Sequence, residues 1–136
     1  MIALAFALYL SSPYAVDGDT IRINTEWVRL AQVDAPEKSE CQGWEATEFT
    51  RKFLENTGKI KLISDGRLDN VDKYDRSIRY LVKGNKNLNL ELVKNGYAKP
   101  YFFNNTRGKY AKQIEQYARQ AKASRLGLWN CKTGEK

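Results

Sequence analysis

The chain has 136 residues, a formal charge of +7 and no histidine, and 42% of its residues are hydrophobic. This length fits one domain, and the hydrophobic fraction is sufficient for a packed core. No stretch reaches the ~20 consecutive apolar residues that a membrane-spanning helix needs. The positive charge favours a polyanionic partner but does not identify one by itself, because many secreted proteins are also basic.

The chain starts with the apolar, small-residue-rich segment MIALAFALYLSS. This segment is similar to the apolar part of a signal peptide, yet no Lys or Arg precedes Arg22, so the charged start of such a peptide is missing. The alternative is a first strand of the fold. We expect residues 1–12 to be a signal-peptide-like segment, residues 13–131 a single domain and residues 132–136 a C-terminal tail.

The chain contains two cysteines, Cys41 and Cys131. With no CxxC motif and no histidine, the usual ligands of a zinc site are missing. In an exported protein the two cysteines predict a disulfide that ties the C-terminus to the segment after Glu37. Two unpaired thiols in a reducing compartment are the alternative. We favour the disulfide and, with it, export to the periplasm or the medium.

Hydrophobic periodicity predicts strands in the first half of the chain and mainly helices in the second. Strands first, with one helix early and two late, indicate an α+β domain built on a small barrel. The last predicted helix carries an apolar stripe that begins at Tyr110. This stripe indicates core packing rather than a ligand site. The predicted strands are 20–23, 27–33, 59–63 and 77–82, and the predicted helices are 44–56, 87–95 and 107–125.

Charged residues gather in three places along the chain. Taken singly, each cluster is typical of an ordinary turn, strand exit or charged loop. The clusters are Asp17-Gly18-Asp19-Thr20, then Arg29 with Asp34 and Glu37, then Asp72-Lys73-Tyr74-Asp75-Arg76.

Together, the clusters indicate phosphate chemistry. Asp19 and Asp34 lie at strand ends and would meet if the two strands are neighbours, and oxygen-only ligands suit Ca²⁺ or Mg²⁺. The planar forks of Arg29 and Arg76 match phosphate oxygens and stabilise the charge that builds on a phosphodiester under attack. Glu37, close to Asp34, can take a proton from an attacking water. Phosphodiester hydrolysis is therefore possible without histidine.

Several motifs follow one another along the chain. They are V-D-G-D-T, R-L-x-x-V-D-x-P-E, D-K-Y-x-R, N-L-x-L-E-L-V-K-N-G-Y-A-K and L-G-L-W-N. In this order and spacing, from about Tyr14 to Trp129, the chain resembles the staphylococcal nuclease family. The resemblance implies an OB-fold five-stranded β-barrel with three helices. It also implies Ca²⁺-dependent endonuclease activity on DNA and RNA that leaves 3′-phosphate ends.

The resemblance also implies the site residues. The Ca²⁺ ligands are Asp19, Asp34 and the backbone carbonyl of Ala35, and Asp17 is an acid close to the metal that acts through water. The two phosphate-clamping arginines are Arg29 and Arg76, and the general base is Glu37. Contacts to a terminal phosphate come from Lys73 and Tyr74.

The chain departs from the family pattern at three places. Asp75 replaces the usual glycine before the second arginine, and the loop 38–43 is short. Counted back from Trp129 without gaps, the two base-flanking aromatic positions hold Phe102 and Asn104. Phe102 would stack on a base and contribute to substrate binding, whereas Asn104 would not.

Because every side chain of the catalytic set is present, we expect an active nuclease. We also expect it to be a monomer and to prefer single-stranded substrate, since a groove of the OB type takes unstacked chain. A barrel of the same family that binds nucleic acid without cleaving it is the alternative, and a purely structural domain would do neither.

Overall fold

The structure is a computed structural model that describes residues 13–55 and 58–132. The signal-peptide-like segment 1–12 and most of the predicted C-terminal tail lie outside the described residues. The domain boundaries therefore stay a prediction, whereas the α+β class is confirmed by the strands and helices described below.

The strands form a mixed sheet in the order β1-β2-β3-β6-β5, with β7 paired to β6. Among the strand pairs of the described residues, β3 and β6 run parallel and the others in this sheet are antiparallel. A second, two-stranded sheet joins β4 to β8. Within the described residues β1 does not pair with β5, so closure of the expected barrel is not seen. The bounds are β1 Tyr14–Ala15, β2 Thr20–Ile23, β3 Glu26–Leu30, β4 Val33–Asp34, β5 Ile60–Ile63, β6 Ser77–Lys83, β7 Lys86–Asn87 and β8 Lys99–Pro100.

The single strand predicted at 27–33 is wrong, because the chain turns after Leu30. Gln32 has φ 67°, in the left-handed region, which breaks the strand into β3 and β4. The buried amide of Asn89 stabilises this break by donating to the carbonyl oxygens of Ala31 at 2.9 Å and Arg79 at 3.2 Å. The break directs β4 away from β3 and onto β8.

The three predicted helices are confirmed among the residues that the structure places. Their bounds are α2 Gly43–Glu55, α3 Leu88–Lys94 and α4 Ala111–Ala123. Asn87 caps α3 by accepting a hydrogen bond from the Leu90 N–H, and Gly96 follows the helix with φ 80°. Helix α4 begins later than the predicted residue 107, and the short 3₁₀ turn η1, Phe103–Asn105, precedes it.

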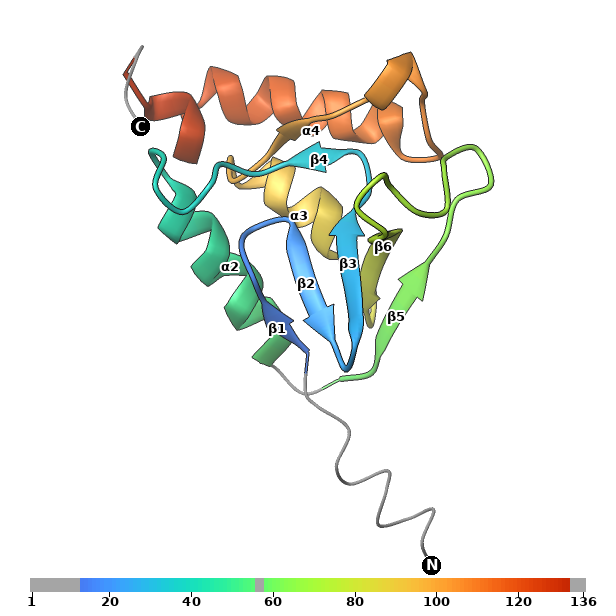
Figure 1. Cartoon of the computed structure of the whole chain (residues 1–136). Helices are drawn as coiled ribbons and strands as arrows, with labels where there is room; N and C mark the ends of the chain where they lie inside the picture. Colours follow the sequence, from blue (N-terminus) through green and yellow to red (C-terminus); the bar gives the residue numbers. More distant parts are fainter. Residues whose placement is uncertain (1–12, 56–57, 133–136) are drawn as a thin grey trace, which may run out of the picture.

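The helices cover the strands from two directions, and the hydrophobic core lies between them. Figure 1 shows α4 across the top of the molecule and α2 along the side of β1. Ile114 on α4 is fully buried, and Tyr110 directly before the helix packs against the core, as predicted. Each such buried aliphatic side chain stabilises the fold by about 1.5–3 kcal/mol. None of the helices in the described parts of the chain has both the length and the apolar character needed to cross a membrane.

The predicted disulfide between Cys41 and Cys131 is present, with a Cα–Cα distance of 6.2 Å. It links the loop before α2 to the 3₁₀ turn η2, Gly127–Asn130, across 90 residues of sequence. A closed loop of this length removes chain entropy from the unfolded state that corresponds to about 4–5 kcal/mol.

The Asp65 carboxylate connects the end of β5 to the start of α4. It accepts hydrogen bonds from the Tyr80 hydroxyl at 2.7 Å and from the Lys109 N–H at 2.8 Å. Although burial alone would raise the pKa of Asp65, the N–H groups of Lys109 and Arg67 and the Tyr80 hydroxyl lower it below its usual value. The ionised carboxylate is therefore favoured by folding.

Replacing Asp65 by Asn tests this connection. A depressed carboxyl pKa contributes stability that is present above the unfolded-state pKa of about 4 and is lost as the pH falls through the folded-state pKa. We expect Asp65→Asn to lower the free energy of unfolding by on the order of 1 kcal/mol at pH 7 and by less at pH 3. Urea unfolding of both proteins between pH 3 and pH 7 measures the difference, and an equal loss at all pH values would contradict the assignment.

Candidate active site

A cavity of about 530 Å³ opens at the edge of the sheet where β3 and β4 meet. Segment 67–76 forms one wall of the cavity, and segment 101–106, which follows β8, forms another. The predicted site residues among its lining are Arg29, Asp34, Lys73, Tyr74 and Arg76.

The turn before β2 packs tightly against the exit of β4 and against α2. A Cβ atom on Gly18 would lie 2.7 Å from the Ala35 Cβ and 2.9 Å from the Ala46 Cβ, so only glycine fits there. The Thr50 hydroxyl donates to the Gly18 carbonyl oxygen at 2.6 Å. The Asp17 carboxylate accepts from the Asp19 N–H at 3.1 Å. The turn thereby directs the Asp19 side chain into the protein.

Asp19 is the buried carboxylate of the site, with 6% of its surface exposed. Its Oδ2 accepts a hydrogen bond from the Ala35 N–H at 2.7 Å and lies 3.3 Å from the Arg29 Nη2. Burial raises the pKa of Asp19 to about 7, and the nearby Asp17 carboxylate adds to the rise, while Arg29 and the Ala35 N–H oppose it. A cation close to Asp19 would relieve the cost of burying its charge.

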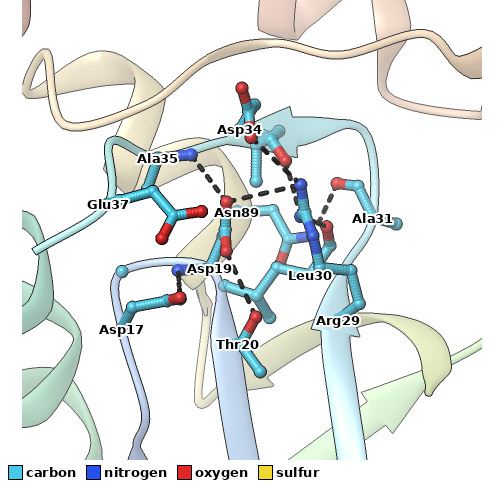
Figure 2. A network of polar contacts seen from close by, with 12 residues as sticks. Asp17, Asp19, Thr20, Arg29, Leu30, Ala31, Asp34, Ala35, Glu37 and Asn89 are labelled. Carbon is cyan, nitrogen blue, oxygen red and sulfur yellow. Dashed lines mark hydrogen bonds and ion pairs between the residues drawn. The ribbon is translucent and has the colours of Figure 1, made fainter. Parts of the chain in front are cut away.

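Arg29 joins the two strand ends (Figure 2). Its Nη1 donates to the carbonyl oxygens of Leu30 and Val33, each at 2.7 Å. Its Nη2 lies 3.3 Å from the carboxylates of both Asp19 and Asp34. Both carboxylates therefore contact one guanidinium that lies between them, although β4 pairs with β8 and not with β2. Since both Nη atoms have partners, the guanidinium plane is fixed before any substrate arrives.

The oxygen atoms around Asp19 fit a hard divalent cation. Asp19 and Asp34 offer carboxylate oxygens close to Ala35, while the chain has no histidine and both of its cysteines are in the disulfide. Across residues 13–55 and 58–132, no group of three or more His, Cys, Asp or Glu side chains has a metal-binding arrangement. Two carboxylates would therefore need a backbone carbonyl, waters and a phosphate oxygen to complete the six to eight ligands of Ca²⁺.

Glu37 stands at the other side of Asp19 from Arg29. Figure 2 shows its carboxylate pointing toward Asp19. The Glu37 side chain is exposed, and it makes no hydrogen bond or ion pair to another residue that the structure describes. A carboxylate without a protein partner is free to accept a proton from water.

The second arginine is held by the loop that carries it. Arg76 Nε donates to the Asp72 carboxylate at 2.7 Å, and its Nη1 donates to the Thr20 hydroxyl at 3.4 Å. Burial alone would raise the pKa of Asp72, but hydrogen bonds from the backbone and side chain of Arg76 and from the Tyr74 N–H lower it. The unusual Asp75 is exposed and has φ 63°. It occupies a left-handed position that glycine adopts easily and that Asp tolerates.

The aromatic residues at the cavity differ from the predicted one. Tyr101 and Phe103 line the cavity, whereas Phe102 does not. Phe102 instead packs against the core and lies 4.9 Å from the Arg107 guanidinium. Successive residues of an extended segment point to opposite sides, so Phe102 faces away from the side on which Tyr101 and Phe103 lie. Arg29 lies 5.6 Å from the Tyr101 ring, which brings this ring close to the two carboxylates.

Sequence comparison gives the family. A family model described as "Staphylococcal nuclease homologue" matches residues 27–131. The chain belongs to the staphylococcal nuclease family. The resemblance predicted from the motifs is thereby confirmed, and the α+β fold with three helices is consistent with the OB fold of this family.

The chain shares about one-third of its residues with several named relatives. The chain is 35% identical over 124 residues to a thermonuclease of Staphylococcus intermedius, covering 84% of this chain and 71% of that protein. It is 31% identical over 125 residues to a thermonuclease of Staphylococcus hyicus, covering 85% and 72%. It is 32% identical over 125 residues to the SPbeta prophage-derived endonuclease YokF of Bacillus subtilis, covering 85% of this chain but only 42% of that longer protein.

Gln32 holds one wall of the cavity in place, and the sequence alone did not indicate this role. The buried Gln32 amide donates to the Thr106 carbonyl oxygen at 3.1 Å and accepts from the Gly108 N–H at 2.7 Å. The Gln32 backbone carbonyl accepts from the Tyr101 N–H at 2.8 Å. Gln32 therefore positions the aromatic wall. Only its place directly after an apolar strand could have indicated this role, and that signal is not specific.

Replacing Asp19 by the neutral, equally sized Asn separates its structural from its functional role. A carboxyl pKa raised by folding contributes stability below the unfolded-state pKa, and this contribution is lost as the pH rises through the folded-state value of about 7. At pH 8 and without added cation, we therefore expect Asp19→Asn to be more stable than the wild type by on the order of 1–2 kcal/mol.

Urea unfolding at pH 8 and pH 5 measures this stability difference. We expect the gain to shrink at pH 5, where the wild-type carboxyl is protonated in the folded state. A variant that is less stable than the wild type at pH 8 would show that the Asp19 charge supports the fold.

Proposed function

We propose that this protein is a Ca²⁺-dependent endonuclease that hydrolyses phosphodiester bonds of DNA and RNA and leaves 3′-phosphate ends. Its class as a phosphodiester hydrolase follows from its family and from relatives that are thermonucleases and endonucleases. The arrangement that supports the proposal best is Arg29 fixed between Asp19 and Asp34 beside an open cavity. This arrangement places a phosphate-binding fork next to the oxygen ligands of a hard cation.

Ca²⁺ would be held by the carboxylates of Asp19 and Asp34 and by the backbone carbonyl of Ala35, with Asp17 acting through water. When bound, Ca²⁺ supplies Lewis-acid stabilisation of the negative charge on the phosphate oxygens. Burial of Asp19 keeps competing water away from one face of this site. The interaction between its carboxylate and a cation is stronger there than in bulk solvent.

Three side chains would carry the reaction. Arg29 and Arg76 bind the phosphate, and their charge–charge interactions with it strengthen as negative charge builds on the phosphorus oxygens. Glu37 orients a water molecule and takes its proton as the water attacks phosphorus in line with the leaving 5′-oxygen. The fixed guanidinium plane of Arg29 means that little reorganisation is needed at this step.

The cavity walls suit an unstacked nucleotide. Lys73 and Tyr74 stand on one wall, where we place a terminal phosphate of the substrate. On another wall Tyr101 and Phe103 are exposed and available to stack on a base, and they replace Phe102 in this role. We therefore expect single strands and frayed ends to be cleaved faster than intact duplex. We also expect the enzyme to be a monomer.

Export to the periplasm or the medium is part of the proposal. The Cys41–Cys131 disulfide supports it, because disulfides persist mainly in oxidising compartments. Extracellular or periplasmic nucleic acid would then be the substrate.

Digestion of single-stranded DNA by purified protein tests the proposed function. We expect cleavage with Ca²⁺, no cleavage when a chelator removes it, and phosphate on the 3′ ends of the products. DNA that is retarded in a gel but stays intact in the presence of Ca²⁺ would show a binding protein instead of an enzyme.

Lysine at either arginine position should slow the reaction. Lys keeps the charge but cannot present a planar fork, and the loss of a preorganised donor typically costs about 3–4 kcal/mol, or 10²–10³-fold in kcat. We expect Arg29→Lys and Arg76→Lys each to fall by about this factor in single-turnover cleavage. Arg22→Lys, a surface arginine that stacks on Trp27, serves as the matched control. Near-native rates in either site variant would remove that arginine from the phosphate site.

Replacing Glu37 by Gln distinguishes a base from a metal ligand. Gln cannot accept the proton, so we expect kcat to fall by about 10²–10⁴-fold while Ca²⁺ binding measured by calorimetry is retained. Loss of Ca²⁺ binding in this variant would make Glu37 a ligand, and an unchanged kcat would remove it from proton transfer.

A further inference from the structure

The Glu37 carboxylate makes no hydrogen bond or ion pair to the rest of the described chain, so its direction depends on its backbone. The loop that follows Glu37 bonds to the Glu37 backbone. The Glu40 N–H donates to the Glu37 carbonyl oxygen at 2.9 Å, and the Glu37 N–H donates to the Glu40 Oε1 at 2.8 Å. The two residues thus bond to each other's backbone in both directions.

The same loop closes directly onto helix α2. The Gly43 N–H donates to the Glu40 carbonyl oxygen at 2.9 Å. A Cβ atom on Gly43 would lie 1.7 Å from the Glu37 carbonyl oxygen, so the start of α2 touches the Glu37 backbone. Glycine is the residue that permits this approach. Glu37 is therefore in contact with a 13-residue helix and not with a free loop.

The disulfide connects this loop to the C-terminal end of the described chain. Cys41 lies next to Glu40 and is bonded to Cys131. The Cys131 N–H donates to the Leu128 carbonyl oxygen at 3.1 Å, and the Leu128 N–H donates to the Gly96 carbonyl oxygen at 2.8 Å. The 3₁₀ turn η2 is thereby bonded to the end of α3, and the loop is held by both helices.

We infer that Glu40 and the Cys41–Cys131 disulfide are positioning elements for Glu37, and we name Glu40, Cys41 and Cys131 together the Glu37 clasp. This inference rests on the proposed function, in which Glu37 takes the proton of the attacking water. Misplacement of a catalytic group by about 1 Å can slow a reaction by about 10²-fold. The Glu37 carboxylate is exposed on a short loop, and the described side chains around it do not hold it. Its position therefore has to come from the loop backbone.

The acceptor role of Glu40 gives a sharp test. Glu40→Ala removes the oxygen that accepts from the Glu37 N–H, whereas Glu40→Gln keeps an oxygen at the same place. We expect kcat of Glu40→Ala to fall about tenfold or more, with KM and the Ca²⁺ affinity changed less than about twofold. We expect Glu40→Gln to restore most of the rate. Glu45→Ala, which removes a neighbouring exposed carboxylate on α2, is the matched control and should leave kcat unchanged.

Amide hydrogen exchange of the protein without Ca²⁺ provides a readout independent of activity. We expect the Glu37 amide to be protected in the wild type and in Glu40→Gln, and to exchange faster in Glu40→Ala. The double variant Cys41→Ser, Cys131→Ser should show faster exchange over residues 37–43 and a lower kcat with KM retained. Circular dichroism confirms that each variant is folded.

The outcomes separate the two proposals. A wild-type protein that cleaves nothing with Ca²⁺ overturns the proposed function and the catalytic purpose of the clasp with it. An active wild type whose Glu40→Ala variant keeps its kcat, despite an unprotected Glu37 amide, overturns the positioning role alone. A Glu37 amide that stays protected in Glu40→Ala would also overturn it, because the bond would then contribute nothing to loop order.

Discussion

The site is organised by one electrostatic constraint, a carboxylate that the fold buries beside a single guanidinium. Asp19 loses hydration when it is buried, and Arg29 compensates only part of that loss. The Arg29 guanidinium in turn bonds the carbonyl oxygens of Leu30 and Val33, so the same side chain fixes the break between β3 and β4. Charge burial and backbone geometry therefore depend on each other at this point.

The surrounding structure follows from the need to hold this pair in place. Gly18 allows the turn before β2 to approach Ala35, and Thr50 on α2 bonds the Gly18 carbonyl oxygen. Asn89 on α3 stabilises the strand break from the other side. Each helix that packs near the site contributes a buried polar contact as well as apolar surface. A change in the packing of α2 or α3 would thus shift the positions of the two carboxylates.

Much of this arrangement could be predicted from the sequence, because local patterns determine it. The charged clusters indicated that Asp19, Arg29 and Asp34 act together, and capping residues marked α3 within one residue. The strand break at Gln32 could not be predicted, since a left-handed glutamine is stabilised by distant bonds to 101–108. The sequence also could not show that Tyr101 and Phe103, rather than Phe102, line the cavity. A one-residue shift in an extended segment reverses which side chains face the cavity.

In the function proposed above, a cation neutralises the buried Asp19 carboxylate. Thermal unfolding of the wild type and of Asp19→Asn, each titrated with Ca²⁺ at pH 8, tests it most directly. Because a ligand that binds only the folded state stabilises it, we expect Ca²⁺ to raise the Tm of the wild type and to leave that of Asp19→Asn unchanged. An equal rise in both proteins, or none in either, would contradict it.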